Sequence, residues 1–295
     1  MKQLILLSLL CFGLASCYRL DDTLFNPGET EAYLLNQSEA SLETPAEYDI
    51  PDSLLHLFPL ESQGPDETEA TTIWAVYVGE ISRIATDTVI LYCHGNGGTI
   101  DSYWGRIKVL TNVGGRNRYG VLIMDYRGFG LSEGEPTEEG LNADVDACMK
   151  WLQAQGLTED RLAIYGFSLG SAPAAELSAY PRTLVPSWVF LEAPFASAEV
   201  IVQDAAGIVM PGSFYTNNKV DVAEDVKEIE QPLFWIHGTA DDFLGIETHG
   251  EVVWKNYNGV RGLPIRVEGA DHGDCVEVYG RAPYSEQVLN FLLNR

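Results

Sequence analysis

The stretch Leu162-Ala163-Ile164-Tyr165-Gly166-Phe167-Ser168-Leu169-Gly170-Ser171 joins a short apolar run to a Gly-x-Ser-x-Gly pattern and leads into a segment of small residues. It predicts a strand, a tight turn and a helix that packs closely on a sheet. In such a turn the serine backbone is strained, and glycines two positions before and after it let strand and helix pack without collision. The pattern predicts a nucleophilic Ser168 hydroxyl that projects into a cleft; a glycine-containing turn with an ordinary exposed serine is the alternative.

The rest of the chain alternates short apolar runs with helical stretches, which is typical of a parallel sheet built from right-handed crossovers. Most runs are continuously apolar, as expected for strands that are covered on both faces. An apolar segment at 54–60 and a strand at 72–81 are expected to form an antiparallel edge. The other expected strands are 88–93, 120–125, 161–167, 187–192, 232–237 and 263–267, and the expected helices are 102–113, 138–155, 169–180, 247–257 and 283–293.

Length and composition fit one α/β domain with a large core. The chain has 295 residues, 46% of them hydrophobic, and a formal net charge of −25 from 43 acidic and 18 basic residues. Phosphate backbones would be repelled by this charge, so nucleic acid is not an expected partner. The interval at 195–230 is too long for a simple connection and is rich in apolar residues, so we expect a short cap over the sheet there.

Functional groups of an open α/β sheet collect beyond the carboxyl ends of its strands. His94-Gly95-Asn96-Gly97-Gly98 follows one expected strand, and its glycines allow the backbone to approach a ligand. The backbone N–H of Asn96 would be one oxyanion donor and that of Leu169 the other. A phosphate-binding loop is disfavoured because no GxxxxGK[ST] pattern is present. We expect His94 to brace this loop rather than to transfer protons.

Two further strand ends carry an acid and a base. Asp241 and Asp242 follow His237 at one end, and either could orient an imidazole. His272 lies in a Gly- and Asp-rich loop at the other end and is well placed to act as a general base. The order Ser, Asp, His along the chain is also the order in serine hydrolases whose nucleophile is the serine of a Gly-x-Ser-x-Gly motif.

Five ordered motifs together resemble the α/β-hydrolase superfamily, in particular its Bem46-like and serine aminopeptidase-like branch. The resemblance begins near residue 72 and extends to the C-terminus. Its motifs are His94-Gly95-Asn96-Gly97-Gly98, the segment 125–134 (DYRGFGLSEG), Gly166-Phe167-Ser168-Leu169-Gly170, His237-Gly238-Thr239-Ala240-Asp241 and Gly269-Ala270-Asp271-His272.

The resemblance implies an α/β-hydrolase fold with a mostly parallel central sheet, helices on both faces and a short cap. It implies that Ser168 is the nucleophile, His272 the base and Asp241, rather than Asp242, the orienting acid. The expected activity is hydrolysis of a small-molecule carboxylic ester through an acyl-enzyme. An aminopeptidase or thioesterase with the same triad, or a non-catalytic ligand-binding lipoprotein, are the alternatives. No metal or organic cofactor is expected.

The N-terminus has the features of an export signal: Lys2, an apolar segment from Leu4 to Leu14, and small residues. Leu14-Ala15-Ser16-Cys17 resembles the lipobox of bacterial lipoproteins, which implies removal of residues 1–16 and lipidation of Cys17. The polar, proline-interrupted segment that follows predicts a tether over 17–53 and a folded domain over 54–295. The expected location is the bacterial cell envelope, anchored to a membrane by lipid on its periplasmic or outer side.

Three cysteines remain in the expected domain, namely Cys93, Cys148 and Cys275. They form no CxxC metal pattern, and three thiols cannot all pair with one another. We expect Cys93 and Cys148, which fall in a predicted strand and helix, to be buried free thiols. Cys275 lies close to His272 in sequence, but nothing in its context indicates a nucleophile.

Overall fold

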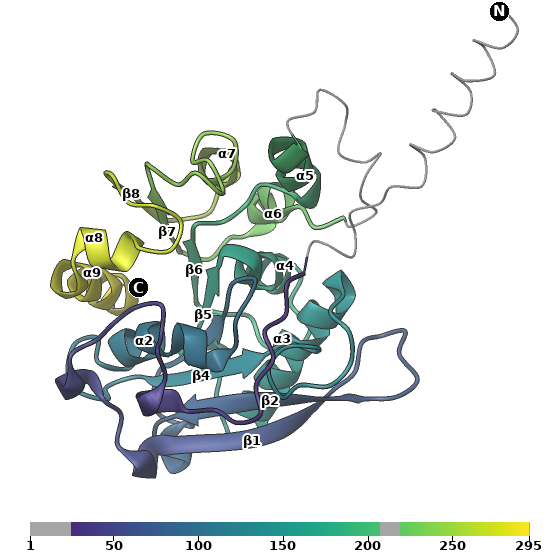
Figure 1. The fold of residues 1–295 in the computed structure, drawn as a ribbon, viewed down its shortest axis with the longest axis vertical. Coiled ribbons are helices and arrows are strands. Elements are labelled where there is room, and N and C mark those ends of the chain that lie inside the picture. Colours follow the sequence, from purple (N-terminus) through teal and green to yellow (C-terminus); the bar gives the residue numbers. More distant parts are fainter. Residues whose placement is uncertain (1–24, 207–218, 295) are drawn as a thin grey trace, which may run out of the picture.

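The computed structural model describes residues 25–206 and 219–294, which form a central sheet with helices on both faces (Figure 1). The sheet has eight strands in the order β1-β2-β4-β3-β5-β6-β7-β8. β1 pairs antiparallel with β2, and β2 pairs antiparallel with β4, whereas the strands from β4 to β8 in this order are parallel. The strands are β1 (Leu55–Ser62), β2 (Thr71–Val78), β3 (Val89–Cys93), β4 (Gly120–Asp125), β5 (Leu162–Phe167), β6 (Trp188–Glu192), β7 (Leu233–Gly238) and β8 (Gly262–Val267).

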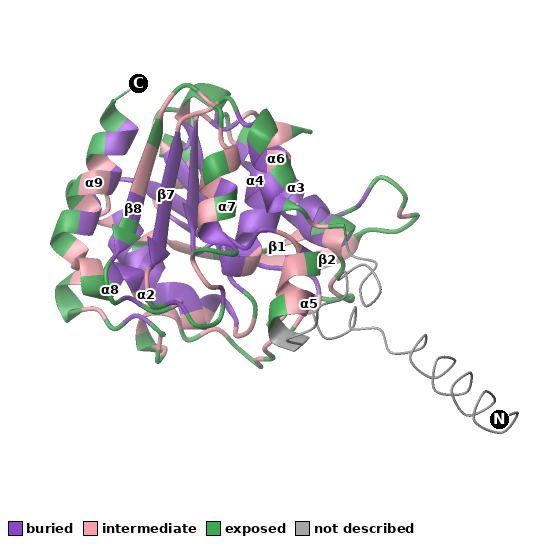
Figure 2. Ribbon diagram, turned by 90° about the horizontal axis from the view of Figure 1, so that it is seen from above, coloured by how far each residue is buried: buried purple, intermediate pink, exposed green. Residues whose placement is uncertain are grey.

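Two apolar clusters, one on each face of the sheet, form the core. Figure 2 shows β7 and β8 between helices α8 and α9 on one side and α7 and α4 on the other. Residues of α3, α4, α6 and α7 belong to one cluster, and residues of α2, α8 and α9 belong to the second. The helices are α2 (Ile100–Thr111), α3 (Glu138–Ala154), α4 (Ser171–Ala179), α5 (Ala198–Ala206), α6 (Val222–Asp225), α7 (Gly250–Asn256), α8 (Cys275–Tyr279) and α9 (Arg281–Leu293).

The architecture is the predicted α/β-hydrolase fold. Every strand expected from the sequence is present, and the antiparallel edge forms from β1 and β2. Each strand of the parallel series from β3 to β7 is fully buried, which explains the continuous apolar runs. The sequence did not indicate α5, α6 and α8; α6 and α8 are only 4 and 5 residues long and cannot repeat an apolar face, whereas α5 lies in the interval that the sequence assigned to the cap. Part of the expected cap, residues 207–218, lies outside the described residues.

The expected tether is wrong for residues 25–53, because this segment packs against the domain. Leu42 and Ile50 are each only 2% exposed and belong to the cluster around α2. The Asp101 carboxylate, in the first turn of α2, accepts hydrogen bonds from the backbone N–H groups of Leu34 (2.8 Å) and Leu35 (2.7 Å). Two apolar anchors and a series of backbone hydrogen bonds therefore fix a segment whose composition is mostly polar.

The same segment contacts a buried carboxylate at the end of β4. Tyr33 Oη donates to Asp125 Oδ2 at 2.7 Å, and the backbone N–H of Ile100 donates to Asp125 Oδ1 at 2.8 Å. The Asp125 side chain is fully buried. Burial and the Asp125 carboxylate raise the pKa of Tyr33 well above its usual value, so the phenol stays a neutral donor. Residues 25–53 thus supply one of the hydrogen-bond donors of the buried Asp125 carboxylate.

The expected signal peptide (1–16), the lipidated Cys17 and the first part of the expected tether lie outside the described residues. Within the described part of the chain, none of the helices combines the length and the apolar character that a membrane span requires.

Tyr33→Phe should lower the free energy of unfolding by about 1–3 kcal/mol, because the buried Asp125 carboxylate loses a hydrogen-bond donor. Urea denaturation of the full chain measures this change. Tyr48→Phe is the matched control: Tyr48 lies in the same segment, and its hydroxyl makes no hydrogen bond to the described residues. Equal stability of the Tyr33→Phe variant and the wild type would show that residues 25–53 are attached without this contact.

Candidate active site

Ser168 lies in the turn between β5 and α4 with a backbone φ of +50°, a strained conformation for a residue with a side chain. The two glycines of the motif make this turn possible. A Cβ added to Gly166 would lie 2.4 Å from the carbonyl oxygen of Gly170, and a Cβ added to Gly170 would lie 2.0 Å from that of Cys93. Both positions therefore require glycine, as the sequence pattern indicated.

Three predicted residues form a continuous chain of hydrogen bonds. His272 Nε2 lies 2.9 Å from Ser168 Oγ, and His272 Nδ1 lies 2.8 Å from Asp241 Oδ2. Nδ1–H donates to the carboxylate, which leaves Nε2 free to accept the serine proton. The Ser168 side chain is 5% exposed and the His272 side chain 20% exposed. The geometry is that of a nucleophile, a base and an orienting acid.

Asp241 is held as an ionised carboxylate by several donors. Its Oδ1 accepts from the backbone N–H groups of Leu244 (2.7 Å) and Phe243 (3.1 Å). Its Oδ2 lies 3.2 Å from His237 Nε2 in addition to its bond with His272. Burial by itself would raise the pKa of Asp241, but the hydrogen bonds from His237, His272 and Leu244 outweigh burial and lower that pKa well below its usual range.

The neighbouring Asp242 takes no part in this arrangement. Its side chain is exposed, whereas Asp241 is buried against His272. The structure thus distinguishes the two aspartates that the strand end alone left equivalent. His237 is a contact that sequence reasoning missed: its Nε2–H is shared between Asp241 Oδ2 and the carbonyl oxygen of Leu244, 2.9 Å away. The i to i+4 spacing of His237 and Asp241 was the signal for this contact.

The Gly-rich loop after β3 packs directly against the Ser168 turn. A Cβ on Gly95 would lie 2.9 Å from the Phe167 ring, so loop and turn touch where the sequence has glycine. His94 is fully buried; its Nδ1 lies 2.8 Å from the carbonyl oxygen of Gly95 and its Nε2 lies 3.3 Å from Asp125 Oδ1. His94 therefore braces the loop and lies outside the Ser168–His272–Asp241 chain.

Asn96 is exposed at the tip of this loop and Leu169 is half-buried beside Ser168. The N-terminal segment reaches the loop as well: the backbone N–H of Asn26 donates to Asn96 Oδ1 at 2.8 Å, and that of Gly28 donates to the carbonyl oxygen of Gly98 at 3.2 Å. The sequence carried no signal for these contacts. Both predicted oxyanion donors thus lie on segments that flank Ser168, and residues 26–28 hold one of those segments.

A buried ion pair supports the His272 loop from behind. Arg106 Nη2 lies 3.2 Å from Glu192 Oε1 and donates to the carbonyl oxygen of Gly273 at 2.8 Å. The guanidinium also lies 4.3 Å from the centre of the Phe167 ring. One side chain therefore contacts the residue before Ser168 and the residue after His272. Sequence reasoning did not identify this pair, because Arg106 and Glu192 belong to distant elements with no local motif.

The three cysteines of the domain are buried free thiols, as expected for Cys93 and Cys148. Burial raises the pKa of the Cys275 thiol far above its usual value, and its Sγ–H faces the carbonyl oxygen of Asp271. Cys275 is therefore a packing residue next to His272. Among the described residues, no three or more His, Cys, Asp and Glu side chains are grouped so that they could hold a metal ion.

Comparison with known proteins yields sequence and structural relatives. A family model described as the alpha/beta hydrolase fold matches residues 88–216. Alpha/beta hydrolase domain-containing protein 17B from Homo sapiens is 30% identical over 209 residues, which are 69% of this chain and 65% of the human protein. Alpha/beta hydrolase domain-containing protein 17C from Mus musculus is 28% identical over 69% of this chain and 59% of its own length. This chain therefore spans somewhat less than two thirds of these relatives.

Solved structures of esterases share the fold. An esterase from Pyrococcus furiosus superimposes with a TM-score of 0.65 at 18% identity, over 91% of this chain and 98% of its own. An esterase from Exiguobacterium antarcticum superimposes with a TM-score of 0.58 at 16% identity, over 80% of this chain and all of its own. The chain therefore has the α/β-hydrolase fold, and the family model of that fold matches its residues 88–216.

Proposed function

We propose that the protein is a serine hydrolase that cleaves a small-molecule carboxylic ester through an acyl-enzyme. The observation that carries this proposal is the hydrogen-bonded chain from Ser168 through His272 to Asp241. The proposal includes that the protein is a member of the Bem46-like and serine aminopeptidase-like branch of the superfamily. The esterases among the structural neighbours support the ester as the bond cleaved, since they share the fold that presents the serine.

In the first half of the reaction His272 Nε2 takes the Ser168 proton while Oγ attacks the acyl carbon. The negative charge moves to the carbonyl oxygen, where the backbone N–H groups of Leu169 and Asn96 would stabilise it. The tetrahedral intermediate then expels the alcohol, which receives its proton from His272. In the second half His272 activates water, which attacks the acyl-enzyme and releases the carboxylic acid and the Ser168 hydroxyl.

Asp241 acts through His272. Its hydrogen bond keeps the proton of neutral His272 on Nδ1, and its charge stabilises the imidazolium that forms when Nε2 takes the serine proton. The low pKa of Asp241 keeps this carboxylate ionised at neutral and mildly acidic pH. His237 and the backbone of Leu244 hold the carboxylate in place, so the imidazole ring has one orientation.

We also propose that the protein is a lipoprotein of the bacterial cell envelope, anchored through Cys17. The lipobox sequence supports this location. Residues 25–53 lie against the domain, so an anchor at Cys17 would leave only residues 18–24 between the lipid and the described structure. The active site would then work close to the membrane surface.

Ser168→Ala should abolish labelling by a fluorophosphonate probe and hydrolysis of p-nitrophenyl acetate, because the nucleophile is lost. Gel fluorescence measures the labelling and nitrophenol absorbance the hydrolysis; heat-denatured wild type is the control for non-specific reaction. Failure of native wild-type protein to react with the probe would contradict the assignment of Ser168. Comparison of acyl esters, thioesters and aminoacyl anilides on the active protein identifies the bond.

Asp241→Asn should lower kcat by about 10³–10⁴-fold, because the amide cannot fix the tautomer of His272 or stabilise its protonated form. Asp242→Asn is the matched control: it removes one negative charge from the adjacent exposed residue and should leave kcat unchanged. Initial rates with a short activated ester give both values. A large loss of kcat in the Asp242→Asn variant and no loss in the Asp241→Asn variant would show that Asp242, and not Asp241, is the orienting acid.

Cys17→Ser should release the protein from the membrane fraction, because the thiol that carries the lipid is absent. Fractionation of expressing cells, with incorporation of a clickable palmitate analogue, measures the effect. Cys11→Ser changes a cysteine inside the expected signal and serves as the control. A Cys17→Ser variant that stays in the membrane and still incorporates the analogue would rule out this anchor.

A further inference from the structure

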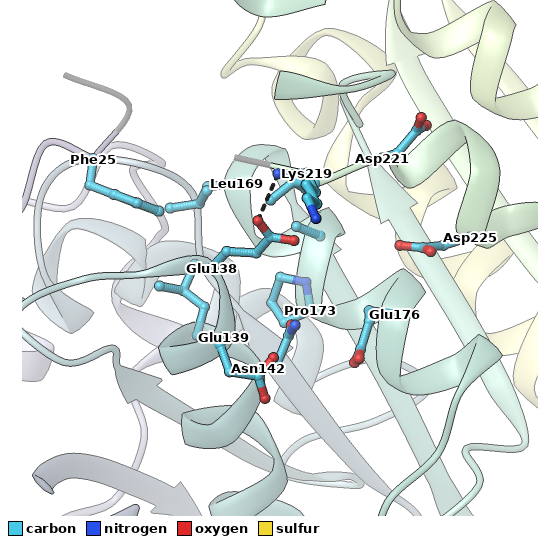
Figure 3. A pocket seen from close by; sticks show the side chains of 13 residues that line it. Phe25, Glu138, Glu139, Asn142, Leu169, Pro173, Glu176, Lys219, Asp221 and Asp225 are labelled. Carbon is cyan, nitrogen blue, oxygen red and sulfur yellow. Dashed lines mark hydrogen bonds between the residues drawn. The ribbon is translucent and has the colours of Figure 1, made fainter. Parts of the chain in front are cut away.

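A cavity of about 140 Å³ lies along α4, the helix that follows Ser168 in the chain. Leu169, Ala172, Pro173 and Glu176 line one wall at the spacing of a single helix face. Figure 3 shows residues of α3 on one side of the cavity, residues of α6 on the other, and Pro173 and Glu176 between them. The cavity therefore shares Leu169, the residue after Ser168, with the candidate active site.

Five carboxylates line this cavity, and they are incompletely neutralised. Glu176 and Glu139 each accept from Arg182 at 2.9 Å. Glu138 Oε2 accepts from the backbone N–H of Lys219, an exposed lysine at the rim, and Asp221 Oδ1 accepts from the backbone N–H of Glu224. The Asp225 carboxylate has no hydrogen bond or ion pair with any described residue, although its backbone N–H donates to the carbonyl oxygen of Asp221.

Asn142 is a second, independent indication that a ligand binds in this cavity. Its side chain lines the same cavity, is only 7% exposed, and makes no hydrogen bond with the described part of the chain. Buried side-chain amides normally find partners, and one that does not is a reason to look for a ligand. The Asn142 amide oxygen lies beside carboxylates and receives no donor from the described residues, so it can contact a cation or accept a hydrogen bond from a ligand.

The electrostatics of the cavity are unfavourable in the empty protein. Burial first, and then the charges of Glu176, Asp221, Glu138 and Glu224, raise the pKa of Asp225 to about 7. Burial likewise raises the pKa of Glu176 despite its pairing with Arg182. Titratable groups with such shifts beside a cleft are typical of functional sites.

We propose that this cavity binds the cationic group of the substrate, an organic ammonium attached to the ester some distance from the scissile carbonyl. The proposal rests on the function proposed above and names the substrate class. Asp225 and Glu176 would receive the positive charge, and the amide oxygen of Asn142 would contact the same cation. The apolar wall of Phe25, Leu169 and Pro173 would contact the hydrocarbon part.

The occupant is an organic cation rather than a metal ion. The cavity combines acidic with apolar side chains, and its carboxylates are not grouped as the ligands of a metal ion among the described residues. Glu176 lies seven positions after Leu169, so the acidic end lies roughly 10 Å from the Ser168 end of the helix. An ammonium group on a chain of several methylenes would reach from one to the other.

Binding of hexyltrimethylammonium to the purified full chain, measured by isothermal titration calorimetry at pH 8, tests the proposal. Hexanesulfonate and 1-hexanol carry the same chain with a negative charge or none. We expect the cation to bind at least about tenfold more tightly than either, since a carboxylate and an ammonium attract strongly in a partly desolvated site. Equal affinity for the cation and the alcohol would overturn the proposal.

Asp225→Asn keeps the size of the side chain and removes the unpaired charge. It should weaken hexyltrimethylammonium binding by about tenfold and leave 1-hexanol binding unchanged. Asp66→Asn is the matched control, because Asp66 is exposed and does not line the cavity. Unchanged cation affinity in the Asp225 variant would overturn the proposal, and thermal melting of each variant verifies that it is folded.

The pH dependence gives an independent readout. Asp225 is neutral below its pKa and charged above it, so cation affinity should rise between pH 6 and pH 8 in the wild type and stay flat in the Asp225→Asn variant. The titratable groups around Asp225 are Glu176 on α4, Tyr180 just after α4, Glu138 and Glu139 on α3, and Asp221 and Glu224 at the start and in the middle of its own helix, with Lys219 and Arg182 as the nearby cations. A flat wild-type profile would contradict the proposal.

Kinetics connect the cavity to the reaction. The p-nitrophenyl ester of 8-(trimethylammonio)octanoic acid should have a higher kcat/KM than the p-nitrophenyl ester of octanoic acid. The Asp225→Asn variant should lose this preference because its KM for the cationic ester rises. Cation binding without any fluorophosphonate labelling would leave the cavity valid and refute the hydrolase. Probe labelling together with no cation preference in either assay would refute the cavity and leave the hydrolase valid.

Discussion

The close approach between the Ser168 turn and the carboxyl end of β3 is the constraint on which the site depends. Gly170 packs so tightly on the carbonyl oxygen of Cys93 that any side chain would collide with it. Cys93 and Gly166 are also paired in the register of β3 and β5. Ser168 and the loop that carries Asn96 are therefore fixed relative to each other by backbone contacts, with no flexible side chain between them. Preorganisation of this kind is what stabilisation of a developing oxyanion requires.

The sequence predicted the fold and the Ser168–His272–Asp241 chain because both depend on local patterns. Continuous apolar runs mark buried parallel strands, and parallel strands bring their carboxyl ends to one edge. Three residues could thus be assigned to one place although Ser168 and His272 are 104 positions apart in the chain. The choice between Asp241 and Asp242 needed the resemblance to a family, because adjacent residues at a strand end differ only in side-chain direction.

What the sequence did not predict depends on contacts between distant elements. Residues 25–53 have the composition of a linker, yet Leu42 and Ile50 are buried and Asp101 and Asp125 accept hydrogen bonds from this segment. The sequence of this segment does not indicate which carboxylates of the domain it will contact. The same holds for Arg106, whose guanidinium joins Glu192 and the His272 loop. A net charge of −25 likewise indicates an acidic surface but not where acidic groups will be crowded.

Two carboxylates close to the site show how hydrogen bonding decides the effect of burial. Asp241 is buried among donors and its pKa is lowered, whereas Asp225 is partly buried among other carboxylates and its pKa is raised to about 7. The second arrangement opposes the chemistry proposed for Ser168, because an oxyanion and a carboxylate charge roughly 10 Å away, at the acidic end of the cavity, repel each other by about 1–2 kcal/mol at an effective dielectric constant of 20. A substrate that brings its own cation to Asp225 would remove this repulsion when the oxyanion forms. The acidic cavity therefore destabilises the oxyanion least when the substrate itself is positively charged.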